Sequence, residues 1–207
     1  MQKLEMLYQH QDFGKAVEIN ALWYNALKIA EIFSNILEKE FDSTISARVE
    51  NSFEKFYSQE GLYDTIEPLN NKIRPNQIIA IGLEFSPIKK EKAKEILDLI
   101  EKELYTSKGL KTLSNEDKDY KPYYYGGAYE RDLSYHQGTV WPYLLMFYNE
   151  ALKKYKKQIN KNIDIEEMLY DACIGNVSEI YDAEEPRKPN GTFAQAWSIA
   201  MLLMHEL

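Results

Sequence analysis

Residues 16–39 read AVEINALWYNALKIAEIFSNILEK, and this stretch gives the clearest indication of how the chain folds. Its apolar residues recur every three or four positions, from Val17 through Leu27 to Ile36. This spacing is typical of an α-helix with a wide apolar face. We therefore predict a long helix over residues 16–39, largely buried on one side.

The rest of the chain shows the same helical spacing, interrupted by two long connections. Further helices are predicted over residues 43–56, 76–84, 89–104, 139–156, 163–174 and 193–207. The connections 105–136 and 175–191 contain several glycines, and the first is also rich in tyrosine. Long loops of this kind inside a compact domain are usually functional. Since no segment alternates apolar and polar residues convincingly, we predict an all-α fold of stacked helical hairpins, with the long loops at one end.

The composition narrows the possible functions. The formal net charge of −8 argues against a nucleic-acid partner. No run approaches the roughly 20 apolar residues of a membrane span, and the N-terminus has no secretory pattern, so we expect a cytoplasmic protein with no membrane partner. A single cysteine and three widely separated histidines predict neither a metal site nor another cofactor. The 16 tyrosines and three tryptophans suit sugar binding, because sugars present flat apolar faces as well as hydroxyls.

Several segments, taken in order, resemble the glucosidase domain of glycogen-debranching enzymes, the amylo-α-1,6-glucosidase part. They are GKAVEINALWYNAL (14–27), RPNQIIAI (74–81), GLKTLS (109–114), RDLSYHQGTVWPYLL (131–145), SEIYDAEEP (178–186) and FAQAWSIA (193–200). The resemblance runs from about Gly14 to the C-terminus. It implies that residues 14–207 are the C-terminal portion of a glucosidase domain, preceded by an atypical segment, residues 1–13.

The resemblance also implies a fold and a reaction. The family fold is an (α/α)6 toroid of six helical hairpins, of which this chain would supply about half, and its reaction is hydrolysis of the α-1,6-linked glucose left at a glycogen branch. Inversion needs a carboxylic acid and a carboxylate base roughly 6.5–9.5 Å apart. The family's base matches Glu179. Its acid is the Asp of a Thr-Trp-Met-Asp-Ala type motif, and because MQKLEMLYQHQDF stands in that place, we expect this chain to lack the acid, with Asp12 or Glu5 as remote substitutes.

Polar and aromatic residues of these segments are candidates for sugar binding. The candidate substrate-binding residues are Glu18, Asn20, Trp23, Arg74, Asn76, Gln77, His136, Gln137, Trp141, Asp182 and Gln195. Among them, Trp141 would offer a stacking platform for a pyranose ring, whereas Trp197 is predicted to lie in the core. Asp182 would bind substrate or orient Glu179.

Each candidate also has a structural interpretation. Glu179 could merely accept hydrogen bonds from backbone amides, and Glu18 or Asn20 could bridge two helices. Arg74 and its neighbours Asn76 and Gln77 could cap a helix.

Three functions remain open at this point. The chain could be part of an active debranching glucosidase acting on a branched α-glucan or oligosaccharide, a noncatalytic carbohydrate-binding remnant, or a helical interaction protein. Because half of a toroid exposes apolar helix faces, we expect it to associate with the missing N-terminal half or with a second copy of itself.

Overall fold

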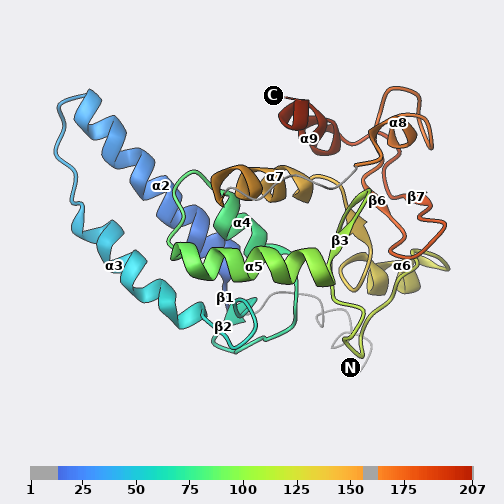
Figure 1. Cartoon of the computed structure of the whole chain (residues 1–207), viewed down its shortest axis with the longest axis horizontal. Coiled ribbons are helices and arrows are strands. Elements are labelled where there is room, and N and C mark those ends of the chain that lie inside the picture. Colours follow the sequence, from blue (N-terminus) through green and yellow to red (C-terminus); the bar gives the residue numbers. More distant parts are fainter. Residues whose placement is uncertain (1–13, 156–162, 207) are drawn as a thin grey trace.

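The computed structural model describes residues 14–155 and 163–206, and its elements are labelled as in Figure 1. The helices are α2 (Val17–Ile36), α3 (Thr44–Phe53), α4 (Asn76–Gly82), α5 (Lys90–Glu103), α6 (Ala128–Tyr135), α7 (Leu144–Tyr155), α8 (Ile165–Met168) and α9 (Ala196–Glu206), with a 3-10 turn, η1 (Glu54–Phe56). The strands are β1 (Lys15–Ala16), β2 (Thr65–Ile66), β3 (Tyr105–Thr106), β4 (Gly109–Lys111), β5 (Val140–Trp141), β6 (Ile180–Tyr181) and β7 (Pro189–Asn190).

The helices pack around α4 and α7. Ile78 and Ile81 of α4 and Leu145 and Tyr148 of α7 are almost completely buried. Helix α2 packs against α4 and, with α3, forms the predicted hairpin of two helices at one end of the molecule (Figure 1). The predicted long first helix is thus confirmed, and through its contact with α4 it attaches the hairpin to the core.

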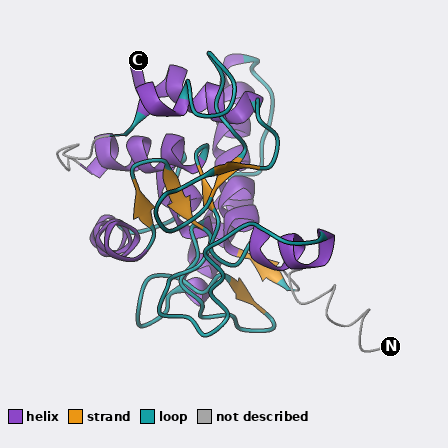
Figure 2. Ribbon diagram, turned by 90° about the vertical axis from the view of Figure 1, so that its right-hand side faces the viewer, coloured by secondary structure: helices purple, strands orange, loops and turns teal. Residues whose placement is uncertain are grey.

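The prediction of an all-α fold is confirmed only in part, because the described residues also form a five-stranded antiparallel sheet in the order β3-β4-β5-β6-β7. The sheet lies in the middle of the molecule, with helices above it and long loops below it in the view of Figure 2. Trp141 on β5 pairs with Leu110 on β4, and Ile180 on β6 pairs with Asn190 on β7. Each strand has only two or three residues, which is too short for an alternating pattern to appear in the sequence.

Close strand packing explains one glycine of the sheet. Gly109 has a φ of +152°, and a Cβ added to it would lie 2.6 Å from the carbonyl oxygen of Trp141. Glycine is the residue that tolerates both this backbone conformation and this approach.

Several predicted boundaries also need correction. The region 105–136, predicted to be a loop, contains β3, β4 and α6. The helix predicted over 139–156 begins only at Leu144, because its first residues form β5. The helix predicted over 163–174 is limited to Ile165–Met168. The N-terminal segment 1–13, with the substitute acids proposed there, lies outside the described residues.

One face of α2 has no cover within the described part of the chain. Ile19, Trp23, Phe33 and Ile36 are exposed and recur at helical spacing along it. The opposite face, which includes Ala21, is buried against the core. Helix α2 is therefore apolar on both sides, as a helix between two packed layers would be. Within residues 14–155 and 163–206, no helix combines the length and the apolar character that crossing a bilayer requires.

Candidate active site

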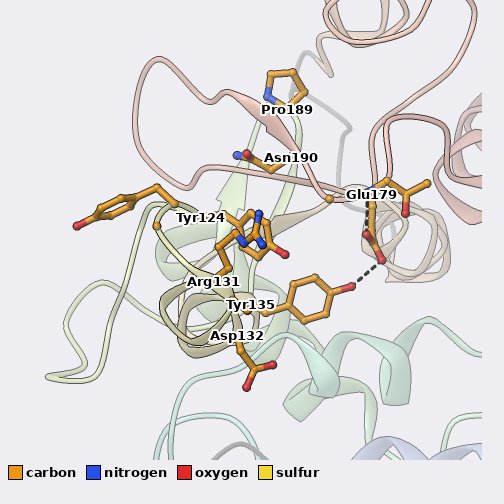
Figure 3. Close-up of a pocket in the computed structure, with 12 residues that line it drawn as sticks. Tyr124, Arg131, Asp132, Tyr135, Glu179, Pro189 and Asn190 are labelled. Atoms are coloured by element: carbon orange, nitrogen blue, oxygen red, sulfur yellow. Dashed lines mark hydrogen bonds between the residues drawn. The ribbon is translucent and has the colours of Figure 1, made fainter.

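Glu179 lies immediately before β6, at the edge of an open pocket (Figure 3). The Tyr135 hydroxyl donates a hydrogen bond of 2.6 Å to its Oε1, and the backbone N–H of Thr192 donates one of 3.0 Å to its Oε2. The carboxylate is half-buried. Glu179 belongs to the hairpin of β6 and β7. Both of its oxygens are therefore held by donors that come from different parts of the chain.

A glycine makes this carboxylate geometry possible. Gly191 has a φ of +69°, and a Cβ added to it would lie 2.5 Å from the Oε2 of Glu179. A side chain at this position would both strain the backbone and collide with the carboxylate. The hairpin therefore needs glycine at residue 191 to place Glu179 beside the Thr192 amide.

Tyr135, the last residue of α6, is fixed by the residues that follow it. Its carbonyl oxygen accepts hydrogen bonds from Thr139 Oγ1 at 2.6 Å and from Trp141 Nε1 at 3.2 Å. Its ring contacts those of His136 and Trp141, both with centroids at 4.8 Å, and that of Tyr124 at 5.9 Å. Burial, together with the hydrogen bond to Glu179 and its charge, raises the pKa of the Tyr135 hydroxyl. The hydroxyl is thus a neutral donor at physiological pH.

The pocket in front of Glu179 has a volume of about 800 Å³. Tyr124, Tyr125, Arg131, Asp132 and Asn190 are among the residues that line it. The guanidinium of Arg131 lies 5.9 Å from the centre of the Tyr124 ring, which favours a fixed position through a cation–π contact. Flat rings beside donors and acceptors are the combination that binds a hydroxylated ring.

Asp182 supports the rim of this pocket from behind. It is only 8% exposed, and its Oδ1 accepts hydrogen bonds from the backbone N–H of Tyr124 at 2.8 Å and from the Asn190 side chain at 2.9 Å. Burial raises the pKa of its carboxyl group. Asp182 thus joins two segments of the rim, those that carry Tyr124 and Asn190.

An aromatic cluster made of His136, Trp141, Tyr143 and Trp197 continues from Tyr135. The rings of His136 and Trp141 are stacked at 5.5 Å, and Trp197 lies 6.0 Å from Trp141 and 5.2 Å from Tyr143. Trp141, proposed as a stacking platform, is only 6% exposed, whereas Trp197 is 46% exposed. The prediction that Trp197 lies in the core is therefore wrong, and Trp197 presents the exposed tryptophan ring of the cluster.

Glu18 belongs to the same region. Burial, together with the negative charge of Glu18, raises the pKa of the Tyr143 hydroxyl.

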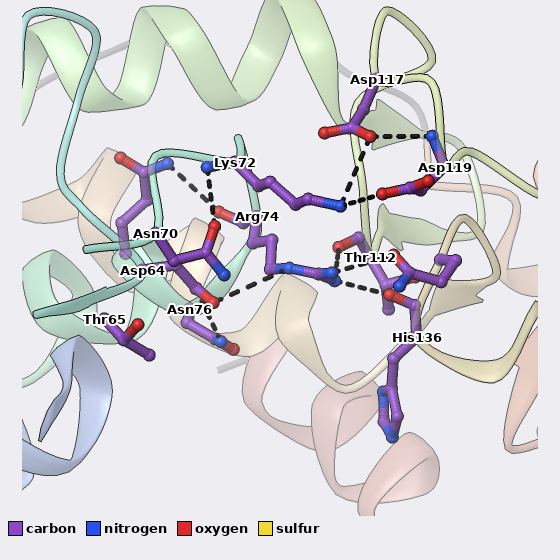
Figure 4. Close-up of polar contacts among 12 residues, drawn as sticks. Asp64, Thr65, Asn70, Lys72, Arg74, Asn76, Thr112, Asp117, Asp119 and His136 are labelled. Atoms are coloured by element: carbon purple, nitrogen blue, oxygen red, sulfur yellow. Dashed lines mark hydrogen bonds and ion pairs between the residues drawn. The ribbon is translucent and has the colours of Figure 1, made fainter. Parts of the chain in front are cut away.

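Arg74 fixes the segment that carries His136 (Figure 4). Its guanidinium donates hydrogen bonds to the carbonyl oxygens of Thr112 at 3.1 Å and His136 at 2.5 Å, and to the Oε1 of Gln137 at 2.9 Å. Gln137 is buried. Arg74 and Gln137 are therefore engaged within the protein and are not among the residues that line the pocket.

The two neighbours of Arg74 also bond within the protein. Asn76 donates to the Oδ1 of Asp64 at 2.9 Å, while Gln77 accepts from the backbone N–H of Leu62 at 3.1 Å and donates to the Arg74 carbonyl at 3.1 Å. These bonds join the segment just before β2 to the start of α4. They do not cap α4, whose N-cap is Pro75.

None of the eleven predicted substrate-binding residues is among those lining the pocket of Glu179. Asn20 donates to the carbonyl of Ala16 at 2.8 Å at the start of its own helix. Trp23 lies on the exposed face of α2. The Oε1 of Gln195 accepts from the backbone N–H of Ala196 at 3.0 Å.

Sequence reasoning missed several of the residues that line the pocket of Glu179. Tyr135, Tyr124, Tyr125 and Asn190 were not predicted to belong to the site. The tyrosine-rich region was predicted to be functional, and Tyr135 stands beside His136 in a segment that carried the resemblance. Among the side chains that the structure describes, no group of three His, Cys, Asp or Glu residues is placed to hold a metal ion.

Comparison with known proteins identifies what this arrangement is similar to. The model of the family described as amylo-alpha-1,6-glucosidase matches residues 12–204. No curated protein sequence matches the chain.

Among solved structures, the GH63 mannosylglycerate hydrolase from Thermus thermophilus has a similar fold. Its complex with glucose aligns with a TM-score of 0.68 and 15% identity, over 93% of this chain and 48% of that one. Its complex with Tris gives a TM-score of 0.65 and 14% identity, over 93% and 45%. At this identity the likeness shows the fold alone. The chain spans about half the length of these structures.

Proposed function

This chain belongs to the amylo-alpha-1,6-glucosidase family, and on that premise we propose that it is the part of a glycoside hydrolase that carries the catalytic base, Glu179. The proposed reaction is inverting hydrolysis of α-1,6-linked glucose at the branch points of a glycogen-type glucan. The observation that carries the proposal is the Glu179 carboxylate, held by Tyr135 and Thr192 at the edge of an open, tyrosine-lined pocket.

In this reaction Glu179 takes a proton from a water molecule as the water oxygen attacks the anomeric carbon. The bond from that carbon to the glycosidic oxygen breaks on the opposite face, and a general acid protonates the leaving oxygen. The two hydrogen bonds fix both oxygens of the base while leaving the carboxylate open to the pocket.

Aromatic rings and polar groups around the base would bind the sugar. The exposed ring of Trp197 supplies an apolar face, supported from behind by Trp141. Tyr125 and Arg131 offer hydrogen-bond donors in the pocket. The GH63 hydrolase of similar fold has been solved with glucose, which is consistent with a hexose in this fold.

We further propose that the chain forms about half of an (α/α)6 toroid. Two observations support this: the chain spans about half of the structures it resembles, and α2 presents a second apolar face without cover in the described residues. The other half would cover α2 and supply the general acid, since the family's acid motif is not recognisable in residues 1–13.

Glucose release from a branched limit dextrin tests the proposal. The chain would be assayed alone and after addition of the upstream half of a related enzyme, with the initial anomer of the glucose followed by proton NMR. We expect release of β-glucose after complementation. Sugar binding without release in either assay would contradict the hydrolase and favour a noncatalytic carbohydrate-binding protein, and release by the chain alone would show that another carboxylate serves as acid.

A further inference from the structure

We propose that Tyr135 is a positioning residue for Glu179: its hydroxyl selects the one carboxylate orientation in which Glu179 can act on water. This inference rests on the proposed function of Glu179 as base. The sequence resemblance assigns no role to Tyr135, and the structure holds both partners in place.

The hydrogen bond between them joins two separate parts of the fold. Tyr135 ends α6, whereas Glu179 precedes β6, 44 residues later in the chain. The other donor to the carboxylate, the Thr192 amide, comes from the same hairpin as Glu179. Loss of the Tyr135 hydroxyl would thus leave Glu179 oriented by a donor of its own hairpin. The Tyr135 hydroxyl therefore fixes the position of the carboxylate relative to α6, whose residues also line the pocket.

Tyr135 is itself held more firmly than a surface tyrosine. Two side-chain donors, from Thr139 and Trp141, anchor its carbonyl, and the rings of Trp141, His136 and Tyr124 surround its own ring. A donor fixed by packing orients its partner with little loss of conformational entropy when substrate arrives. Several contacts therefore converge on the position of one hydroxyl group.

The chemistry of the hydroxyl fits the same role. Its bond to Oε1 is 2.6 Å long, which is the short range of an O–H donor to a carboxylate. Because the hydroxyl stays protonated at physiological pH, it can only donate to the charged carboxylate, and it does not compete for the proton of the water. Tyr135 thus orients the base without taking part in the proton transfer.

The test compares Tyr135→Phe with Tyr120→Phe. Tyr120 also donates its hydroxyl to a glutamate, at 2.8 Å to the Oε1 of Glu184, and lies outside the proposed site, so it is a matched control. With glutamate selectively labelled and the Glu179 signal assigned through Glu179→Gln, three-bond couplings report its χ1 rotamers. The kcat and KM for limit dextrin would be measured on the same variants in the complemented assay.

We expect wild type and Tyr120→Phe to show one Glu179 rotamer, and Tyr135→Phe to average over several. A displacement of this kind would lower kcat roughly 10- to 100-fold with KM nearly unchanged. A single rotamer in Tyr135→Phe, averaging in both variants, or averaging with unchanged kcat would overturn the inference. If only Tyr135→Phe shows averaging but even wild type releases no glucose, the positioning stands and the proposed function fails.

Discussion

Replacement of Asp182 by alanine should loosen the rim of the pocket and destabilise the fold. The substitution removes the acceptor of two hydrogen bonds, from the Tyr124 amide at 2.8 Å and from the Asn190 side chain at 2.9 Å. Asp182 is 8% exposed, so water replaces it poorly. A hydrogen bond to a charged group contributes roughly 1.5–3 kcal/mol, and Asn190 keeps a second acceptor in the Lys188 carbonyl, so we expect a loss of about 2–4 kcal/mol.

Asp182→Asn is the matched control, because both bonds reach the same oxygen, Oδ1, and asparagine retains it. We expect this variant to lie within about 1 kcal/mol of wild type at neutral pH. Burial raises the folded-state pKa of Asp182 above its ordinary value of 3.8, so the folded protein binds the proton more tightly than the unfolded chain. The resulting stabilisation is present below pH 3.8 and is lost as the pH rises through the raised value. Wild type should therefore lose stability relative to Asp182→Asn over that window.

Urea unfolding followed by circular dichroism measures these differences, provided that the variants share one m value. Equal free energies of unfolding for the alanine and asparagine variants would refute the reasoning, because they would show that the Oδ1 acceptor contributes nothing. A wild-type stability that rises relative to Asp182→Asn with increasing pH would contradict the sign of the pKa shift.

Three other predictions follow from the structure. Gly191→Ala should lower the melting temperature and any glucose release more than Gly175→Ala does. Both glycines have positive φ, +69° and +74°. A Cβ at residue 191 would collide with the Glu179 carboxylate, whereas a Cβ at residue 175 would meet no atom within 4 Å. Equal effects would mean that the carboxylate adjusts freely. Arg74→Lys should reduce the free energy of unfolding by about 2–4 kcal/mol, because lysine cannot reproduce the three hydrogen bonds of the guanidinium. In the same urea titration, the control Arg48→Lys, at an exposed position, should change the free energy of unfolding by less than about 0.5 kcal/mol. Phe33→Lys, on the exposed face of α2, should leave the fold intact but reduce self-association of the isolated chain, as measured by light scattering. Unchanged association would indicate that another surface mediates it.

The sequence predicted those elements whose packing is periodic and local. Helix α2 was predicted within three residues at its C-terminal end, because buried residues such as Ala21 and Leu27 lie one or two helical turns apart. The sheet could not be predicted, since its strands are held by pairing between distant segments, as between Val140 and Tyr181. A strand of two residues leaves no period to detect.

The same limit applies to the site. Glu179 was proposed through resemblance, but its partner Tyr135 was not, because their contact depends on the relative placement of α6 and the β6–β7 hairpin. Arg74 illustrates the converse: its position before a helix suggested a cap or a ligand, whereas it bonds to His136 and Gln137, more than 60 residues away. Long-range polar partners of this kind are set by the tertiary fold alone.

The most direct test of the central claim is the rate of glucose release from limit dextrin by Glu179→Gln relative to wild type, in the complemented assay. Glutamine keeps the size of the side chain and can still accept from Tyr135, but it cannot take a proton from water. If Glu179 is the base, the rate should fall by roughly 10²- to 10⁴-fold while sugar binding persists. A rate within a few-fold of wild type would show that the base lies elsewhere and would contradict the account.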